Sequence, residues 1–369
     1  MNCYYYNYYL TEVNKDNNKL PETIRKIGRF NDLETDWDLH KVPYKELYKV
    51  RKKDEIMAID LPVFAEVKEA RRWIKAQEPI IVLKNGKAKG YPIQILIWHE
   101  VVNDVFSDKP IVITYSPLCN SANVFSRELD GKVISFGTSG IFRNSCTIMY
   151  DRDTESLWDT FTGEAIAGYY TGKKLEMLPS CMVPFNDFAE SYPEGLVVLS
   201  TETGFIRRYG NNPYVGYDES DRPYFYTGNI DDRLPPFELV IGLSCNGKSR
   251  AYPYKILKEK RVINDDFCEP RVIFFQDGMT SPLDKPVISR GKDIGAAIVF
   301  SPILNGQKLN FYNENNQIYD METNSEWNVL GNSINGKLKG EGLKMLIYWD
   351  SFWFAWSSYF PDTEIYKEN

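Results

Sequence analysis

The chain has 369 residues, of which 43% are hydrophobic, and its formal net charge at pH 7 is −7. This apolar content excludes an intrinsically disordered chain, and the acidic balance excludes nucleic acid as a partner, because phosphate binding needs a basic face. No apolar run approaches the roughly 18 residues that a membrane span requires. The first residues lack the pattern of a signal peptide, so we expect a cytoplasmic protein.

The histidine and cysteine counts narrow the chemistry further. Only two histidines, His40 and His99, are present, which excludes a zinc site with three histidine ligands. The six cysteines form no CxxC pair and no regular spacing, so we expect mostly reduced thiols instead of a zinc ribbon or a disulfide scaffold. These counts predict neither a cofactor nor a metal site.

In chain order, residues 1–55 are expected to form an N-terminal extension, whose basic stretch Lys41–Lys53 is typical of a solvated connector. A helix is predicted over about residues 67–77. Runs rich in Val, Ile, Tyr and Phe then alternate with turn residues, and Asp130-Gly131 is typical of a type I′ hairpin. These features predict a β-rich α+β fold.

Four blocks of sequence recur in the same order. They are 80–104 and 241–265, 122–136 and 297–311, 150–158 and 319–327, and 185–193 and 353–361. Their separation is too long for a solenoid repeat and indicates a duplicated domain. We therefore expect two tandem diverged copies of a hairpin-rich unit with short helices, packed together. The expected units are residues 56–204 and 237–369, with a connector at 205–236.

The repeat allows an internal comparison between shared and unshared residues. Asn85-Gly86, Tyr91-Pro92 and Asn103-Asp104 recur, and we interpret them as turns and caps. Polar or reactive residues that occur only in the first unit are better candidates for chemistry. The candidate site residues are Cys119, His99, Glu100 and Ser145, together with Asn144 as a possible orienting group.

At the matching positions of the second unit the chemistry is different. His99-Glu100 is replaced by Lys260-Arg261, and Asn144-Ser145 aligns with Asn313-Glu314. Cys119 aligns with no cysteine, because it corresponds to Ile294 or falls beside an insertion in the second copy. The second unit is therefore expected to be degenerate, and any activity is expected in the first.

Cys119 lies in a tight connection between two strand-like runs, where free backbone N–H groups can lower the pKa of a thiol. His99 is the only plausible imidazole partner, and Glu100, Asn144 or Asp104 could orient it. This pattern favours a thiol-centred enzyme of the hydrolase or transferase type.

Two other classes of function remain open. Cys119, His99 and Met149 together could form a soft site for copper or a redox centre. Alternatively, the protein is a non-catalytic binding module whose first unit has a polar cleft for a small molecule or a peptide. The string WHEVVND at 98–104 lacks the second histidine of a metalloprotease motif.

Several longer strings resemble a known family. They are AIDLPVF (58–64), GYPIQILIWHEVVND (90–104), TYSPLCNSANVF (114–125), FGTSGIFRNS (136–145), MYDRDTESLWDTFTGEAIAG (149–168) and FWFAWSSYFPDTEIY (352–366). Together they resemble the uncharacterised family called domain of unknown function 3179, over about residues 56–366. The resemblance implies no established activity or cofactor, although many members look exported. Where the family usually has CPLC and NSD, this chain has Ser116-Pro117-Leu118-Cys119 and Asn144-Ser145-Cys146.

Overall fold

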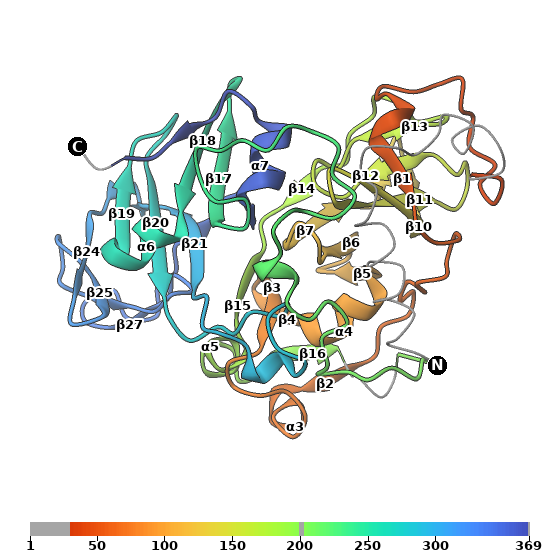
Figure 1. The fold of residues 1–369 in the computed structure, drawn as a ribbon. Coiled ribbons are helices and arrows are strands. Elements are labelled where there is room, and N and C mark those ends of the chain that lie inside the picture. Colours follow the sequence, from red (N-terminus) through yellow and green to blue (C-terminus); the bar gives the residue numbers. More distant parts are fainter. Residues whose placement is uncertain (1–29, 199–202, 368–369) are drawn as a thin grey trace.

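The structure, a computed structural model, describes residues 30–198 and 203–367. Strands dominate, and the α-helices within these ranges have seven residues or fewer. The predicted β-rich fold is confirmed. In Figure 1 the first half (residues 30–198) lies to the right and the second half (residues 237–367) lies to the left. The connector, residues 205–236, runs between them.

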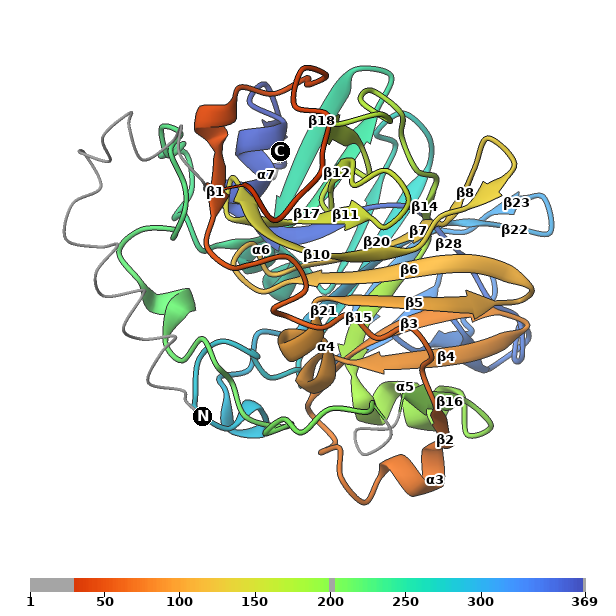
Figure 2. The same cartoon turned by 90° about the vertical axis from the view of Figure 1, so that its right-hand side faces the viewer.

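Three sheets and a small hairpin form the first half (Figure 2). The first sheet has the order β15 (Cys181–Pro184), β3 (Pro79–Asn85), β4 (Lys87–Pro92), β16 (Leu196–Val198) and β2 (Phe64–Glu66). The second has the order β14 (Met177–Leu178), β7 (Ser121–Ser126), β6 (Lys109–Ser116) and β5 (Val101–Phe106). The third has the order β1 (Leu47–Lys49), β10 (Phe136–Arg143), β11 (Cys146–Asp151), β12 (Leu157–Asp159) and β13 (Ala165–Ala167). The hairpin is β8 (Glu128–Leu129) with β9 (Lys132–Val133), and the helices are α3 (Val67–Ala70), α4 (Ile93–His99) and α5 (Phe185–Ser191).

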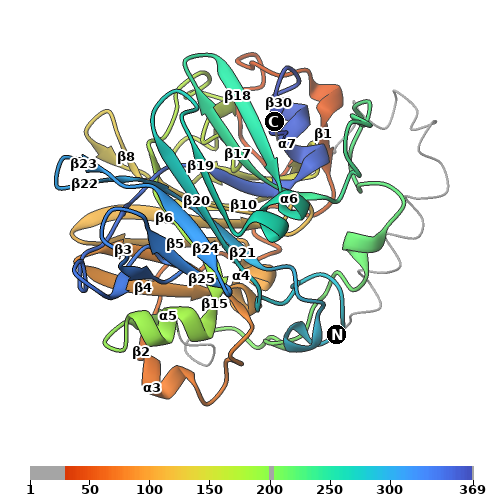
Figure 3. The same ribbon diagram turned by 90° about the vertical axis from the view of Figure 1, so that its left-hand side faces the viewer.

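The second half contains sheets with a corresponding strand order (Figure 3). They are β29 (Trp349–Phe352), β17 (Leu239–Cys245), β18 (Lys248–Pro253) and β30 (Glu364–Ile365); β28 (Lys344–Met345), β21 (Ala296–Ser301), β20 (Arg271–Gln276) and β19 (Val262–Asp265); and β24 (Phe311–Glu314), β25 (Gln317–Asp320), β26 (Glu326–Trp327) and β27 (Ser333–Asn335). The hairpin is β22 (Ile303–Leu304) with β23 (Gln307–Lys308), and the helices are α6 (Tyr254–Lys260) and α7 (Trp353–Tyr359). Short 3₁₀ turns occur at Tyr44–Glu46, Tyr217–Glu219 and Ile288–Arg290.

Both halves contain the same hydrogen-bonded hairpin around a buried tryptophan. The indole Nε1 of Trp158 donates to Asp151 Oδ2 at 2.9 Å, and that of Trp327 donates to Asp320 Oδ2 at 3.0 Å. Each aspartate also accepts the backbone N–H of the threonine three residues later. In this Asx turn the aspartate accepts both the indole N–H and a backbone N–H, so neither buried donor lacks a partner. This explains why Asp, Thr, Ser and Trp recur at this spacing.

Some predicted elements differ from the observed ones. The helix predicted over residues 67–77 contains only α3, which is followed by turns. Asn103-Asp104, interpreted as a turn or cap, lies inside β5, where the Asn103 amide hydrogen-bonds both backbone groups of Phe136 and so joins β5 to β10. The basic stretch 41–53 contains β1, which pairs with β10.

The two halves pack through a reciprocal pair of contacts. Strand β29 of the second half packs against β7, and β15 of the first half packs against β21. The indole Nε1 of Trp349 also crosses between the halves and donates to the backbone oxygen of Phe161 at 2.7 Å. Buried residues from both halves form one continuous hydrophobic core. No helix within the described ranges is long and apolar enough to cross a membrane.

Candidate functional site

Cys119 lies in the turn that joins β6 to β7, as its sequence context predicts. Its side chain is fully buried, and Sγ donates a weak hydrogen bond to the backbone oxygen of Ser116 at 3.7 Å. The backbone oxygen of Cys119 accepts a hydrogen bond from the backbone nitrogen of Phe352 in β29. The turn is therefore packed against the second half, and the thiol has no access to solvent.

His99, the last residue of α4, is also buried, and both its ring nitrogens have partners. Nδ1 lies 2.6 Å from the backbone oxygen of Met57, which can only accept, so we assign the ring proton to Nδ1. Nε2 then accepts a hydrogen bond from the hydroxyl of Tyr209 at 2.6 Å. Burial lowers the pKa of His99 to about 4, so the imidazole is neutral at pH 7.

The predicted pairing of Cys119 with His99 is not formed. Within the described part of the chain, no hydrogen bond joins the thiol to the imidazole, because both ring nitrogens bond to Met57 and Tyr209. The imidazole is therefore not placed to accept the thiol proton, which is the first requirement of a cysteine nucleophile with a histidine base.

Glu100, predicted to orient His99, instead follows the end of α4 with a φ of 59°. Its carboxyl group is fully buried, and this burial raises the pKa of Glu100 to about 7. Oε1 has no hydrogen-bond partner among the described residues. Arg261 follows α6 with a φ of 64°, so the positive φ belongs to the end of the helix in both halves and does not depend on the carboxyl group.

The three side chains of the predicted copper site lie in separate surroundings. Met149 lies in β11 and packs in a hydrophobic cluster with Trp158, whereas Cys119 belongs to the main core and His99 contacts Met57. Within the described residues, no group of three or more His, Cys, Asp or Glu side chains is arranged to hold a metal ion. The geometry therefore gives the copper interpretation no support.

Asn144 and Ser145 form the two-residue turn between β10 and β11, and both have positive φ, 49° and 65°. The corresponding turn of the second half is Asn315-Asn316, with φ of 52° and 64°. The alignment of Asn144-Ser145 with Asn313-Glu314 is therefore wrong. The first hairpin is longer than the second and reaches further toward the connector.

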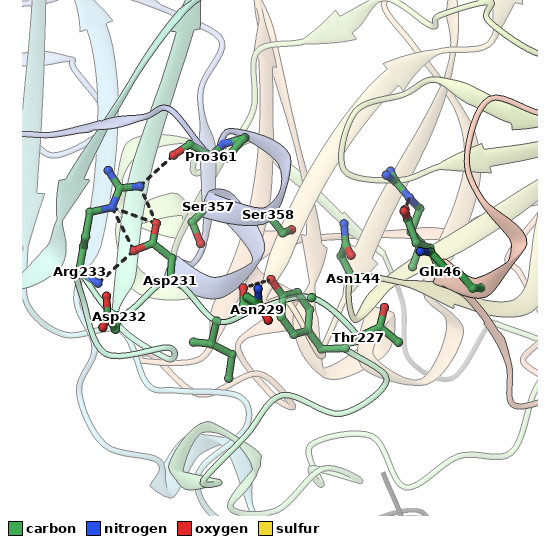
Figure 4. A pocket seen from close by; sticks show the side chains of 15 residues that line it. Glu46, Asn144, Thr227, Asn229, Asp231, Asp232, Arg233, Ser357, Ser358 and Pro361 are labelled. Carbon is green, nitrogen blue, oxygen red and sulfur yellow. Dashed lines mark hydrogen bonds and ion pairs between the residues drawn. The ribbon is translucent and has the colours of Figure 1, made fainter. Parts of the chain in front are cut away.

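The longer hairpin brings Asn144 and Ser145 to different environments. Ser145 is buried, and its hydroxyl donates to the backbone oxygen of Tyr224 in the connector at 2.5 Å. Asn144 lines a cavity of about 850 Å³ between the two halves. Its side chain makes no hydrogen bond to any described residue and is oriented toward the cavity (Figure 4).

This cavity is assembled from three parts of the chain (Figure 4). Lys45, Glu46 and the end of the first hairpin form one side, and connector residues 226–233 form another. The end of α7 contributes Ser357 and Ser358, whose hydroxyls donate to backbone oxygens of their own helix. Three basic and three acidic side chains line the cavity, so its walls carry no formal net charge.

Arg143 connects the cavity to a buried network behind it. Its Nε donates to Glu46 at 3.0 Å, and Nη1 lies 3.3 Å from Oδ2 of the fully buried Asp159. The same Asp159 oxygen accepts a hydrogen bond from the hydroxyl of Tyr359 in α7 at 2.7 Å. Burial raises the pKa of Asp159, and the charge of Arg143 opposes that effect.

On the connector side of the cavity, the charge of Arg233 is also balanced by a carboxylate. It forms an ion pair with Asp231 at 2.5 Å and donates to the backbone oxygens of Pro361 and Thr363. Lys45 and Asp232, which have opposite charges, form no ion pair with the described residues and are exposed. The cavity therefore offers neutral hydrogen-bonding groups beside two paired arginines and two exposed, unpaired charges of opposite sign.

Residues 53–363 match a family model described as Protein of unknown function (DUF3179). The chain belongs to this family. Comparison with curated proteins and with solved structures found no match. The description of DUF3179 assigns no activity.

In this DUF3179 chain, Ser116 and Cys146 are neighbours in space. The hydroxyl of Ser116 accepts a hydrogen bond from the backbone nitrogen of Thr147 at 2.9 Å, which brings Cys146 close to the turn containing Cys119. Sequence reasoning did not include Cys146 or Arg143 in the site. One feature of the sequence could have revealed them. The second and third repeated blocks lie further apart in the first copy than in the second, which indicates a longer first hairpin.

The described cysteines are not all reduced. Cys245 and Cys268 form a disulfide, whereas Cys119, Cys146 and Cys181 are free and buried. Three of the five described cysteines are therefore free, as the prediction of mostly reduced thiols has it, and the Cys245–Cys268 pair is the exception. The cytoplasmic location stays a prediction.

Proposed function

We propose that the protein is a binding module that holds a neutral, hydroxyl-rich small molecule, such as a sugar or a polyol, in the cavity between its halves. The observation that carries this proposal is the cavity itself, whose volume of about 850 Å³ suits a small ligand. By contrast, neither Cys119 nor His99 lines this cavity, and no hydrogen bond joins them among the described residues.

The ligand class follows from the groups that remain free to bind. The side chains of Asn144, Thr227 and Asn229 border the cavity without a hydrogen bond to any described residue (Figure 4). An amide offers both donors and acceptors, which matches the hydroxyls of a sugar. Arg143 and Arg233 are already paired with carboxylates, so neither guanidinium favours an anionic ligand.

We also propose that the two halves are diverged copies of one unit. The matching strand orders and the Asp–Trp hydrogen bond of each hairpin support this interpretation. On this proposal, the second copy is a structural partner that closes the cavity through α7. The first copy supplies the hairpin end that contacts the ligand.

The test is ligand-observed NMR by saturation transfer with glucose, mannose and N-acetylglucosamine as probes, and with glycine and methylphosphonate as comparisons. We expect saturation transfer to at least one sugar and none to glycine or methylphosphonate. Asn144→Gly removes the amide but keeps a residue that tolerates the positive φ. Losing one hydrogen bond of about 0.5–1.5 kcal/mol should weaken binding by about two- to tenfold.

Asn315→Gly is the matched control, because Asn315 has the same backbone conformation in the second hairpin and does not line the cavity. It should leave sugar binding unchanged. Absence of transfer to every sugar, or equal weakening by both variants, would overturn the proposed function.

A further inference from the structure

Cys119 and Cys146 lie next to each other at the boundary between the halves. Ser116 links them, because its backbone oxygen accepts the hydrogen bond from Cys119 Sγ and its hydroxyl accepts the backbone N–H of Thr147. Both thiols are fully buried and free. After burial, the largest effect on the pKa of Cys146 is its hydrogen bond with Cys119, and both raise that pKa.

Groups from outside the first half cover this pair of thiols. The hydroxyl of Tyr217 in the connector donates to the backbone oxygen of Leu118 at 2.9 Å, and Phe352 donates its backbone N–H to Cys119. Ser145, immediately before Cys146, is fixed to the connector through Tyr224. The pair therefore lies where the first half, the connector and the second half meet.

The second half has no such pair among its described residues, for two independent reasons. Its β20 and β21 are joined by a long loop, residues 277–295, in place of the tight turn that contains Cys119. Its β24–β25 hairpin turns at Asn315-Asn316, before the position that Cys146 occupies in the longer first hairpin. The two thiols meet only because the first half has both the short turn and the long hairpin.

We propose that Cys119 and Cys146 are an oxidisable dithiol that forms an intrachain disulfide. With a peroxide as the oxidant, the two thiols lose two protons and two electrons, an S–S bond forms, and hydrogen peroxide is reduced to two molecules of water. The disulfide would join the β6–β7 turn to the hairpin that ends at Asn144, beside the cavity. This inference does not rest on the proposed function.

The test treats the folded full-length protein with hydrogen peroxide and maps disulfides by mass spectrometry of peptides digested without reductant. We expect one new cross-linked peptide that contains Cys119 and Cys146, and faster formation at pH 8.5 than at pH 6.5, because the thiolate is the reacting form. Cys119→Ala and Cys146→Ala should each abolish it. Cys181→Ala is the matched control, because Cys181 is also buried and free, and it should retain the cross-link.

A second measurement needs no oxidant. Phenylarsine oxide condenses with two neighbouring thiols, forming two As–S bonds and releasing one water molecule. We expect one arsenical per chain in the parent and in Cys181→Ala, and none in Cys119→Ala or Cys146→Ala. Oxidation without a cross-link, a cross-link through Cys181 or Cys3, or no reaction at either cysteine overnight would overturn the proposal.

Discussion

The two halves contact each other through corresponding residues with different chemistry. Asp159 and Asn328 each follow the buried tryptophan of their hairpin. Asp159 accepts a hydrogen bond from Tyr359 of α7 at 2.7 Å, whereas Asn328 donates to Ser191 of α5 at 2.9 Å. One contact is charged and the other is neutral. The two halves therefore have matching strand orders, whereas the charged contact and the cavity both occur where the first hairpin meets α7.

The largest losses of stability are expected at the buried tryptophan that both halves contain. Trp158→Ala and Trp327→Ala should each lower the free energy of unfolding by about 3–5 kcal/mol, because each empties a buried indole site. Urea unfolding measures both changes. Trp98→Ala, at a partly exposed tryptophan, should cost less. If either Trp158→Ala or Trp327→Ala left the stability unchanged, the two tryptophans would not have the same structural role.

The pH dependence of stability should differ between the halves at His99, because the second half has Lys260 at the matching position. The pKa of His99 is about 4 when folded and near its ordinary value of 6.5 when unfolded. As pH falls from 6.5 to 4, the unfolded chain therefore takes up a proton that the folded protein does not. This difference in proton uptake lowers the free energy of unfolding by an amount on the order of 3 kcal/mol at most.

Buried carboxyl groups oppose that loss. Burial raises the pKa values of Glu78, Glu100 and Asp350 to about 7, so these groups bind protons in the folded protein before they do so in the unfolded chain. Their contribution to stability therefore grows as pH falls from 7. His99→Gln removes only the histidine effect, so its stability relative to the parent should increase on acidification. A stability difference that stays constant from pH 6.5 to 4.5 would contradict the assignment.

A smaller effect separates the charged contact from the neutral one. Asp159→Asn leaves Arg143 facing a neutral amide and should cost about 2 kcal/mol of unfolding free energy, as expected for a hydrogen bond to a charged group. Ser191→Ala, which removes only the neutral hydrogen bond of the other contact, should cost about 1 kcal/mol. Urea unfolding of both variants tests the difference, and equal costs would show that the charge has no special role.

The sequence predicted the shared features better than the unshared ones. The Asp130-Gly131 hairpin is confirmed, since both residues have positive φ between β8 and β9. Such turns depend on local backbone chemistry, which sequence patterns reveal. Asn103 was interpreted as a turn residue because its role, bridging β5 to Phe136, depends on a contact between distant strands.

The candidate site could be predicted only in part for the same reason. Cys119 was selected because no cysteine matches it in the second unit, and Asn144 was selected as an orienting group; both lie at the boundary between the halves. The partner of Cys119 was taken to be His99, although the structure places Cys146 beside it. That choice depends on how far the first hairpin extends and on where the connector packs, and neither can be read from residue type.

Amide hydrogen exchange of the full chain, with and without the sugar that gives the strongest saturation transfer, shows directly where the ligand binds. We expect slower exchange at residues 143–145 and 226–233, which lie at the cavity. We expect no change at the corresponding turn, Asn315-Asn316. Protection at that turn, or no protection at the cavity, would contradict the claim that binding belongs to the first half and the connector.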